Sequence, residues 1–255
     1  MAIWHEIQGV DYLCRHETFV WRIVEDQSKS TTRKFVDSLE EHEVLENLIE
    51  ASKPKLTITP KESSDLHYLL STPFRYPPLR WGSRFGTRFD RGILYGSLDL
   101  PTAMCEKAYH RLAFLTASEG DLGGKTTYYT SFQFKAQSNT FVNLIQNPFN
   151  TYQDLITSKK SYDFTQALGS QMRTAQVDFF LYPSARTKEL GQNIGIFSPK
   201  AILHNRQISR TFQSLHCYAT KEMVEFSLTH RKEKIHQFPI ADFLVDGVIP
   251  IPPLA

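Results

Sequence analysis

Residues 92–118 read GILYGSLDLPTAMCEKAYHRLAFLTAS, and this segment decides the fold because one strand is followed in it directly by one helix. The part up to Leu98 is a short apolar run that contains glycines, which is typical of a buried strand. Asp99 can cap the helix after it, and Pro101 is tolerated in the first helical turn. We therefore expect a strand up to Leu98 and a helix that ends before Gly120.

Glu106 is the residue of this helix that packing explains least. The helix carries one apolar stripe, and Glu106 lies about 200° from its first member at ~100° per residue. The side that carries Glu106 is also largely apolar, so its carboxylate is expected to be paired or functional. The alternative is an ordinary surface carboxylate that pairs with Lys107 or His110. The stripe consists of Met104, Ala108, Leu112 and Leu115, and the other side holds Ala103, Tyr109, His110 and Ala113.

The rest of the chain mixes strands with a few helices. Because strands and helices do not alternate regularly, the pattern predicts an α+β fold rather than a doubly wound sheet. An amphipathic helix is expected over 32–51, where apolar residues recur mostly at three- and four-residue steps. The other expected elements are a helix over 163–175 and strands over 19–24, 126–134, 140–144, 178–182, 193–197, 216–220 and 224–230.

A polar segment, PKLTITPKESSD at 54–65, links the N-terminal helix to the arginine-rich part of the chain. We expect residues 1–60 to be a helical extension that packs on a core of residues 61–255. The N-terminal helix then needs no core of its own, and the chain forms a single structural unit.

Composition limits the classes of partner. A formal charge of +2 over 255 residues is too small to make nucleic acid the default ligand. The three cysteines lie far apart and at no metal-binding spacing, which is typical of buried thiols in a reducing compartment. The N-terminus lacks the apolar stretch of a signal peptide, and no run of about 18 apolar residues occurs. These features predict a soluble, cytoplasmic protein with no membrane association.

A second unusual stretch is LRWGSRFGTRFDRGIL at 79–94, where an arginine and an aromatic residue recur every four residues. The planar fork of arginine suits phosphate, and flanking glycines let a ligand approach the backbone. The alternatives are a twisted edge strand with solvated arginines and a platform for single-stranded nucleic acid. The arginines in and beside this window are Arg75, Arg80, Arg84, Arg88 and Arg91.

YPSAR at 182–186 places Ser184 at the end of an apolar strand, where its hydroxyl could bond a substrate. No GxSxG motif surrounds it, so a hydrolase nucleophile is not expected. The alternative is a turn-forming serine after a proline. The chain also lacks the lysine of a P-loop and the order GxGxxG, and its histidines occur in no HxxxH or HExxH pattern, so no metal site is expected.

Taken in order, these motifs resemble the RES domain family, which is named for its Arg, Glu and Ser. The resemblance covers most of residues 19–200, and the ordered set is far more specific than any one motif. The family's Arg, Tyr, Glu and Ser fall on Arg84, Tyr95, Glu106 and Ser184. The motifs are GSRF, GILYGSLDLPTAMCEKAYHRLAFL, YDFTQAL, LYPSAR and GQNIGIF, joined upstream by WRIVEDQ, TRKFVDSLEEHEVLENLIEASKP and PFRYPP.

The resemblance implies an ADP-ribosyltransferase-like fold, in which a split mixed β-sheet with flanking helices forms an NAD cleft. It implies an enzyme that consumes NAD⁺ as a glycohydrolase or a phosphorylase, in many members the toxin of a toxin–antitoxin pair. Glu106 would then stabilise the oxocarbenium ion and Arg84 would grip the pyrophosphate. Tyr95 and Phe85 would stack on nicotinamide, and Ser184 would bond the ribose or the amide.

The expected ligand is NAD⁺ as substrate, with phosphate as a candidate second substrate and without a metal. The candidate protein partners are a helix-turn-helix antitoxin and a second copy of the chain.

Three other readings stay open. A protein ADP-ribosyltransferase usually has a second Glu two residues before the catalytic one, and this chain has Met104 there, which favours a small-molecule acceptor. A module for single-stranded nucleic acid would use the arginine and aromatic residues of 79–94. An interaction scaffold without turnover is the third.

Overall fold

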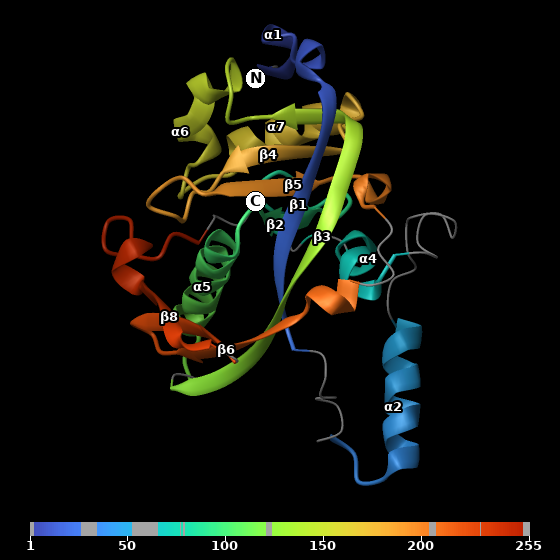
Figure 1. The fold of residues 1–255 in the computed structure, drawn as a ribbon, viewed down its shortest axis with the longest axis vertical. Helices are drawn as coiled ribbons and strands as arrows, with labels where there is room; N and C mark the ends of the chain where they lie inside the picture. The colour runs from blue at the N-terminus through green and yellow to red at the C-terminus, as the bar shows by residue number, and fades with distance from the viewer. Residues whose placement is uncertain are drawn as a thin grey trace.

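The computed structural model describes residues 3–26, 35–52, 66–76, 78, 80–120, 124–203, 208–229 and 231–251. In this part of the chain eight strands form one mixed sheet, and helices flank it (Figure 1). The expected α+β class is therefore confirmed.

The strands are ordered β1-β2-β5-β4-β3-β6-β7-β8 across the sheet, and β1 pairs with β3 as well as with β2. The pairing of β3 with β4 is parallel, and the other pairings between the described strands are antiparallel. Their bounds are β1 Cys14–Glu25, β2 Leu94–Ser97, β3 Lys125–Asn143, β4 Phe179–Pro183, β5 Gln192–Ile196, β6 Gln213–Ala219, β7 Met223–Leu228 and β8 Arg231–Pro239.

The long strand β3 joins two parts of the sheet. Phe141 to Asn143 pair with β4, and Lys125 to Ser131 pair with β6. Because β1 pairs with both β2 and β3, the strands β1, β2, β5, β4 and β3 close into a ring, whereas β6, β7 and β8 extend from it. Figure 1 shows β4 and β5 near one end of β3 and β6 near the other.

The longest described helices are α5 (Leu100–Ala117) and α2 (Leu39–Ser52). None of the described helices is both long and apolar enough to cross a membrane. The other helices are α1 Ile3–Glu6, α4 Tyr68–Arg75, α6 Gln153–Ile156 and α7 Asp163–Thr174, and the 3-10 helices are η1 Gly9–Tyr12, η3 Phe149–Tyr152, η4 Pro199–Ala201, η5 Ile208–Thr211 and η6 Ile240–Asp242.

Helix α5 begins where the sequence predicts. The side chain of Asp99 accepts hydrogen bonds from the backbone N–H of Thr102 at 2.7 Å and from its hydroxyl at 2.8 Å, which caps the first turn. The predicted apolar stripe is fully buried and packs against β6 and β7 through residues such as Leu215 and Phe226. The opposite side of α5 is also covered, because Ala103 and Tyr109 are buried. Glu106 therefore emerges from a helix that is packed on two sides.

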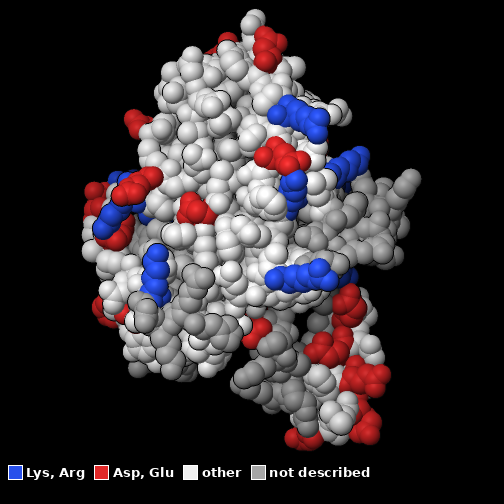
Figure 2. All heavy atoms as spheres, in the orientation of Figure 1, with Lys and Arg blue, Asp and Glu red and all other residues white. Residues whose placement is uncertain are grey.

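Helix α2 has a different relation to the core. It spans Leu39–Ser52, so the described residues 35–38 of the predicted segment lie outside it, and none of its residues is buried. An ion pair of 3.0 Å joins Arg75 Nη1 to Glu50 Oε1 and connects α2 to the end of α4. Figure 2 shows acidic side chains gathered over this helix. The expected start of this helix at residue 32 lies outside the described residues, and so does the whole predicted linker 54–65.

Two strands predicted separately, over 126–134 and 140–144, are one strand, β3. The polar residues between them suggest a break, but their backbone pairs with β1 without interruption from Lys135 to Ser138. Their side chains also have partners, since Lys135 forms an ion pair with Glu17 and Ser138 Oγ donates to Asp178 at 2.5 Å. The sequence prediction was wrong here because local polarity does not report cross-strand partners.

The structure differs from the sequence analysis at three further points. The charged segment RKEKIHQFP forms β8 on the edge of the sheet, although its composition hides a strand. Cys14 is exposed at the start of β1, whereas Cys105 and Cys217 are buried as expected. The first strand is also longer than the predicted 19–24 segment, because it extends along β3 from Cys14 to Glu25.

Candidate active site

The carboxylate of Glu106 receives two hydrogen bonds on the same oxygen. Ser184 Oγ donates to Oε1 at 2.7 Å, and Asn193 Nδ2 donates to it at 2.6 Å. The three side chains come from α5, from the end of β4 and from β5. Among the described residues no hydrogen bond reaches Oε2, and no ion pair joins Glu106 to Lys107 or His110. The surface alternative for Glu106 is therefore not what the structure contains.

Asn193 is oriented by a partner of its own. Ser97 Oγ donates to Asn193 Oδ1 at 2.7 Å, which leaves the amide NH₂ to face Glu106. Ser97 and Asn193 are cross-strand partners on β2 and β5, and both are 2% exposed. A buried amide needs such partners because unpaired polar groups are costly inside a protein. The hydrogen bonds from Ser97 to Asn193 and from Asn193 to Glu106 thus hold the carboxylate of Glu106 in a defined orientation.

Ser184 serves both the turn and the carboxylate. Its hydroxyl oxygen accepts from the backbone N–H of Arg186 at 3.1 Å and of Thr187 at 3.3 Å, while its proton is donated to Glu106. Ser184 has no exposed surface. The structure therefore contains the turn-forming serine, whose hydroxyl also bonds Glu106. A hydrogen bond from Ser184 to a substrate stays a prediction.

Arg84 is drawn into the protein, whereas Arg80, Arg88 and Arg91 are exposed. Its Nη1 donates to the backbone oxygens of Ile156 at 3.0 Å and Ser158 at 2.9 Å, at the end of α6. The guanidinium carbon lies 4.6 Å from the ring centroid of Tyr162. The four-residue repeat therefore places one arginine inward and leaves its neighbours at the surface. The segment is a turn and not an edge strand, because the backbone groups of Ser83 and Gly86 bond to each other.

Tyr95 holds the loop that carries Arg84. Its hydroxyl lies 3.0 Å from Ser83 Oγ and accepts from the backbone N–H of Phe85 at 3.1 Å, so it contacts the residues on both sides of Arg84. From α7, Gln166 Nε2 donates to the backbone oxygen of Ser83 at 3.0 Å. Burial raises the pKa of Tyr95 to about 12, so its hydroxyl stays neutral at ordinary pH.

Phe85 does not have the position that the sequence prediction requires. It has no exposed surface, and its ring packs edge-on against Phe180 at 4.6 Å and Tyr182 at 4.8 Å between centroids. A ring enclosed in this way offers no face to nicotinamide. Phe85 therefore anchors the loop around Arg84, which we call the arginine loop, in the core. The prediction that its ring stacks on the substrate is corrected.

The predicted residues belong to one electrostatic neighbourhood. The pKa of Tyr182 is raised well above its usual value, first by burial and next by the Glu106 carboxylate, while Arg84 opposes the shift. Tyr95 and Tyr162 also act on it. The structure thus brings residues from α5, the arginine loop, β2 and β4 into mutual range.

Sequence reasoning missed three side chains of this neighbourhood, Asn193, Tyr162 and Arg186. All three lie in motifs that were noticed, GQNIGIF, YDFTQAL and LYPSAR. The sequence does indicate a role for Asn193, because a polar residue inside a short apolar strand must find hydrogen-bond partners. Arg186 and Tyr162 had none, since their neighbours are distant in sequence.

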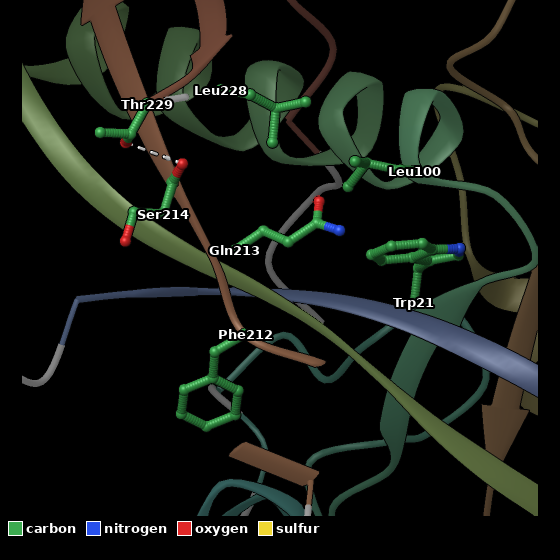
Figure 3. Close-up of a pocket in the computed structure, with 7 residues that line it drawn as sticks. All are labelled: Trp21, Leu100, Phe212, Gln213, Ser214, Leu228 and Thr229. Carbon is green, nitrogen blue, oxygen red and sulfur yellow. Dashed lines mark hydrogen bonds between the residues drawn. The ribbon is translucent and has the colours of Figure 1, made fainter. Parts of the chain in front are cut away.

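The structure also contains a cavity of about 400 Å³ that lies elsewhere (Figure 3). Figure 3 shows the indole of Trp21 below Leu100, with Gln213 beside them. None of the predicted site residues lines it, and the described residues that line it include no titratable side chain. The cavity is lined by Trp21, Leu100, Phe212, Gln213, Ser214, Leu228 and Thr229. We take the Glu106 neighbourhood as the candidate site because it holds the oriented carboxylate and the inward-facing Arg84.

Fold and site together define an α+β protein with an oriented carboxylate in the same neighbourhood as an inward-facing arginine. The RES domain model matches residues 59–216, so the chain belongs to the RES domain family. No curated protein matches the chain. Among solved structures, a chain of the M. tuberculosis MbcT-MbcA toxin-antitoxin complex is similar at 10% sequence identity, with a TM-score of 0.44 and 92% of each chain covered. At that TM-score the similarity does not establish a common fold.

Proposed function

We propose that this protein is an NAD⁺-consuming enzyme that cleaves the nicotinamide–ribose bond as a glycohydrolase or a phosphorylase. We also propose that its fold is ADP-ribosyltransferase-like. Membership of the RES domain family supports both statements. The observation that carries the proposal is the Glu106 carboxylate, whose Oε1 is held by Ser184 and Asn193 while Oε2 has no hydrogen bond among the described residues.

The chemistry needs little more than a placed negative charge. When the glycosidic bond to nicotinamide breaks, positive charge develops on the ribose as an oxocarbenium ion. A carboxylate beside that ribose stabilises the charge in the transition state and costs no reorganisation if it is already oriented. Nicotinamide leaves as a neutral molecule, so no general acid is required. Glu106 would supply the carboxylate, with Oε2 facing the ribose.

The other predicted residues would position the substrate. Arg84 would bind the pyrophosphate with the part of its fork that the two backbone carbonyls leave free. The half-buried ring of Tyr95 remains our candidate surface for nicotinamide, although its hydroxyl is used inside the protein. Ser184 would act by orienting Glu106.

We propose water or phosphate rather than a protein as the acceptor. Protein ADP-ribosyltransferases usually place a second Glu two residues before the catalytic one, and here Met104 is fully buried in the core at that position. The resemblance to the family further suggests a toxin that a helix-turn-helix antitoxin neutralises, with a homodimer as a candidate assembly. The N-terminal residues would complete the same structural unit, since β1 pairs with β2 and β3.

The test is to incubate the purified protein with NAD⁺, with and without phosphate, and to follow nicotinamide and the ribosyl product. Release of nicotinamide by the wild-type protein but not by Glu106→Gln is the expected result. ADP-ribose as product would identify a glycohydrolase, and its 1″-phosphate a phosphorylase. A folded wild-type protein that releases no nicotinamide under either condition would refute the proposal.

A further inference from the structure

Arg186 is a buried cation with no anionic partner among the described residues. It is 3% exposed, and its Nη1 is buried and has no hydrogen-bond partner in the described part of the chain. No ion pair among the described residues includes it. Its Nη2 makes one long hydrogen bond of 3.4 Å to the hydroxyl of Tyr162.

Its surroundings fix it next to the candidate site. The guanidinium carbon lies 3.5 Å from the ring centroid of Tyr109, which is a close cation–π contact. Its backbone N–H donates to Ser184 Oγ, the group that in turn donates to Glu106. Tyr162 receives the guanidinium of Arg84 over its ring and that of Arg186 at its hydroxyl. Two arginines from distant segments therefore converge on one tyrosine.

An arginine that is buried without a counter-charge destabilises the folded protein. A buried charge that lacks a counter-charge is strongly unfavourable, and a cation–π contact offsets only part of the cost. The neighbouring carboxylate, Glu106, already receives its hydrogen bonds from neutral donors. Arg84 is also partly occupied, because its Nη1 is committed to two backbone carbonyls. A ligand with two anionic groups could therefore accept hydrogen bonds from the part of the Arg84 guanidinium that the carbonyls leave free and from Nη1 of Arg186.

We propose that Arg186 is a second oxyanion-binding residue of the site and that it binds a phosphate group together with Arg84. The proposal rests on the proposed function in that the phosphate is taken to belong to the reaction. Its source is either the pyrophosphate of the dinucleotide or inorganic phosphate that accepts the ribosyl group. A merely structural role, in which Arg186 only packs on Tyr109, predicts no change in the affinity for phosphate compounds.

The test compares Arg186→Gln and Arg186→Lys with the wild-type protein, using Arg88→Gln as the matched control. Arg88 also lies over an aromatic ring, at 4.5 Å from the centroid of Phe89, but it is exposed. Calorimetry with ADP-ribose and with inorganic phosphate measures binding without any need for turnover. Adenosine, which has no phosphate, serves as the reference ligand.

The expected result is that Arg186→Gln weakens binding of ADP-ribose or of inorganic phosphate about 10- to 100-fold, the loss of a charge-assisted hydrogen bond. Arg186→Lys should weaken it less, and Arg88→Gln should change it less than about twofold. The compound that loses affinity identifies the source of the phosphate. If Arg186→Gln does not fold, Arg186→Lys and Tyr162→Phe take its place. The first replaces the guanidinium with an ammonium group and the second removes the hydroxyl that Arg186 contacts, and both keep the positive charge.

Wild-type affinity for both compounds in the folded variants would overturn the proposal, whether or not the enzyme cleaves NAD⁺. Conversely, binding that depends on Arg186 in a protein that releases no nicotinamide would preserve this proposal and refute the proposed reaction. The two conclusions can therefore fail separately.

Discussion

Replacing Glu106 with glutamine removes one negative charge and almost nothing else. The carboxamide has the shape of the carboxylate, and its oxygen can accept the bonds of 2.7 Å from Ser184 and 2.6 Å from Asn193. Its NH₂ then occupies the position of Oε2, which has no hydrogen bond to lose among the described residues. We therefore expect the variant to fold as the wild-type protein does.

The size of the effect depends on the charge that is lost. A carboxylate about 4 Å from a developing unit charge contributes about 4 kcal/mol at an effective dielectric constant of about 20. Because each 1.36 kcal/mol changes a rate about tenfold, kcat/KM for NAD⁺ should fall about 1,000-fold. The melting temperature should change by less than about 3 °C, since no hydrogen bond is lost.

The assay measures nicotinamide release by chromatography in the wild-type protein and in Glu106→Gln, with Glu119→Gln as the control. Glu119 is an exposed glutamate just beyond the end of α5, so its loss should leave the rate unchanged. If the folded Glu106→Gln protein kept more than a tenth of the wild-type rate, the carboxylate could not be the group that stabilises the ribosyl cation.

Three further outcomes are expected. Arg84→Ala should lower kcat/KM for NAD⁺ by about 100-fold or more through the lost phosphate contact, whereas Arg88→Ala at the surface should cost less than about twofold in the same assay. Tyr95→Phe should reduce the free energy of unfolding by about 1–3 kcal/mol near pH 8, because the N–H of Phe85 loses its acceptor. Burial raises the pKa of Tyr95 to about 12 from about 10, so the folded state holds that proton more tightly and loses the advantage as the pH rises from 10 to 12. The difference between Tyr95→Phe and the wild type in denaturant unfolding should therefore shrink by about 1 kcal/mol at about pH 11, and a constant difference would contradict this account. A soluble thiol reagent should modify Cys14 in the native protein and the two buried cysteines, whose pKa values burial raises, only after unfolding. Rapid native modification of all three would contradict the described burial.

Local signals predicted the elements on which the site is built. Asp99 before an apolar-striped helix determines where α5 begins, because a capped first turn is a property of adjacent residues. The short apolar runs that became β2, β4 and β5 are equally local. Glu106 and Ser184 were both named from the sequence, and the structure brings them within 2.7 Å of each other.

Pairings between distant residues could not be predicted from the sequence alone. The polar middle of β3 looks like a break until β1 provides its backbone partners, and Phe85 looks like a ligand-facing ring until Phe180 and Tyr182 enclose it. The convergence of Arg84 and Arg186 on Tyr162 depends on three separate segments.

The sequence by itself thus determined the α+β class, the capped helix that carries Glu106 and the residues that resemble a known family, because each of these is written in neighbouring residues or in an ordered set of motifs. Only the tertiary structure decided which oxygen of Glu106 is held, that Asn193 holds it, and that Arg186 is buried with no counter-charge in the described part of the chain. The physical reason is that burial and hydrogen-bond partnership in this site arise when the sheet forms, from residues as far apart in the chain as Ser97 and Asn193, which are 96 positions apart.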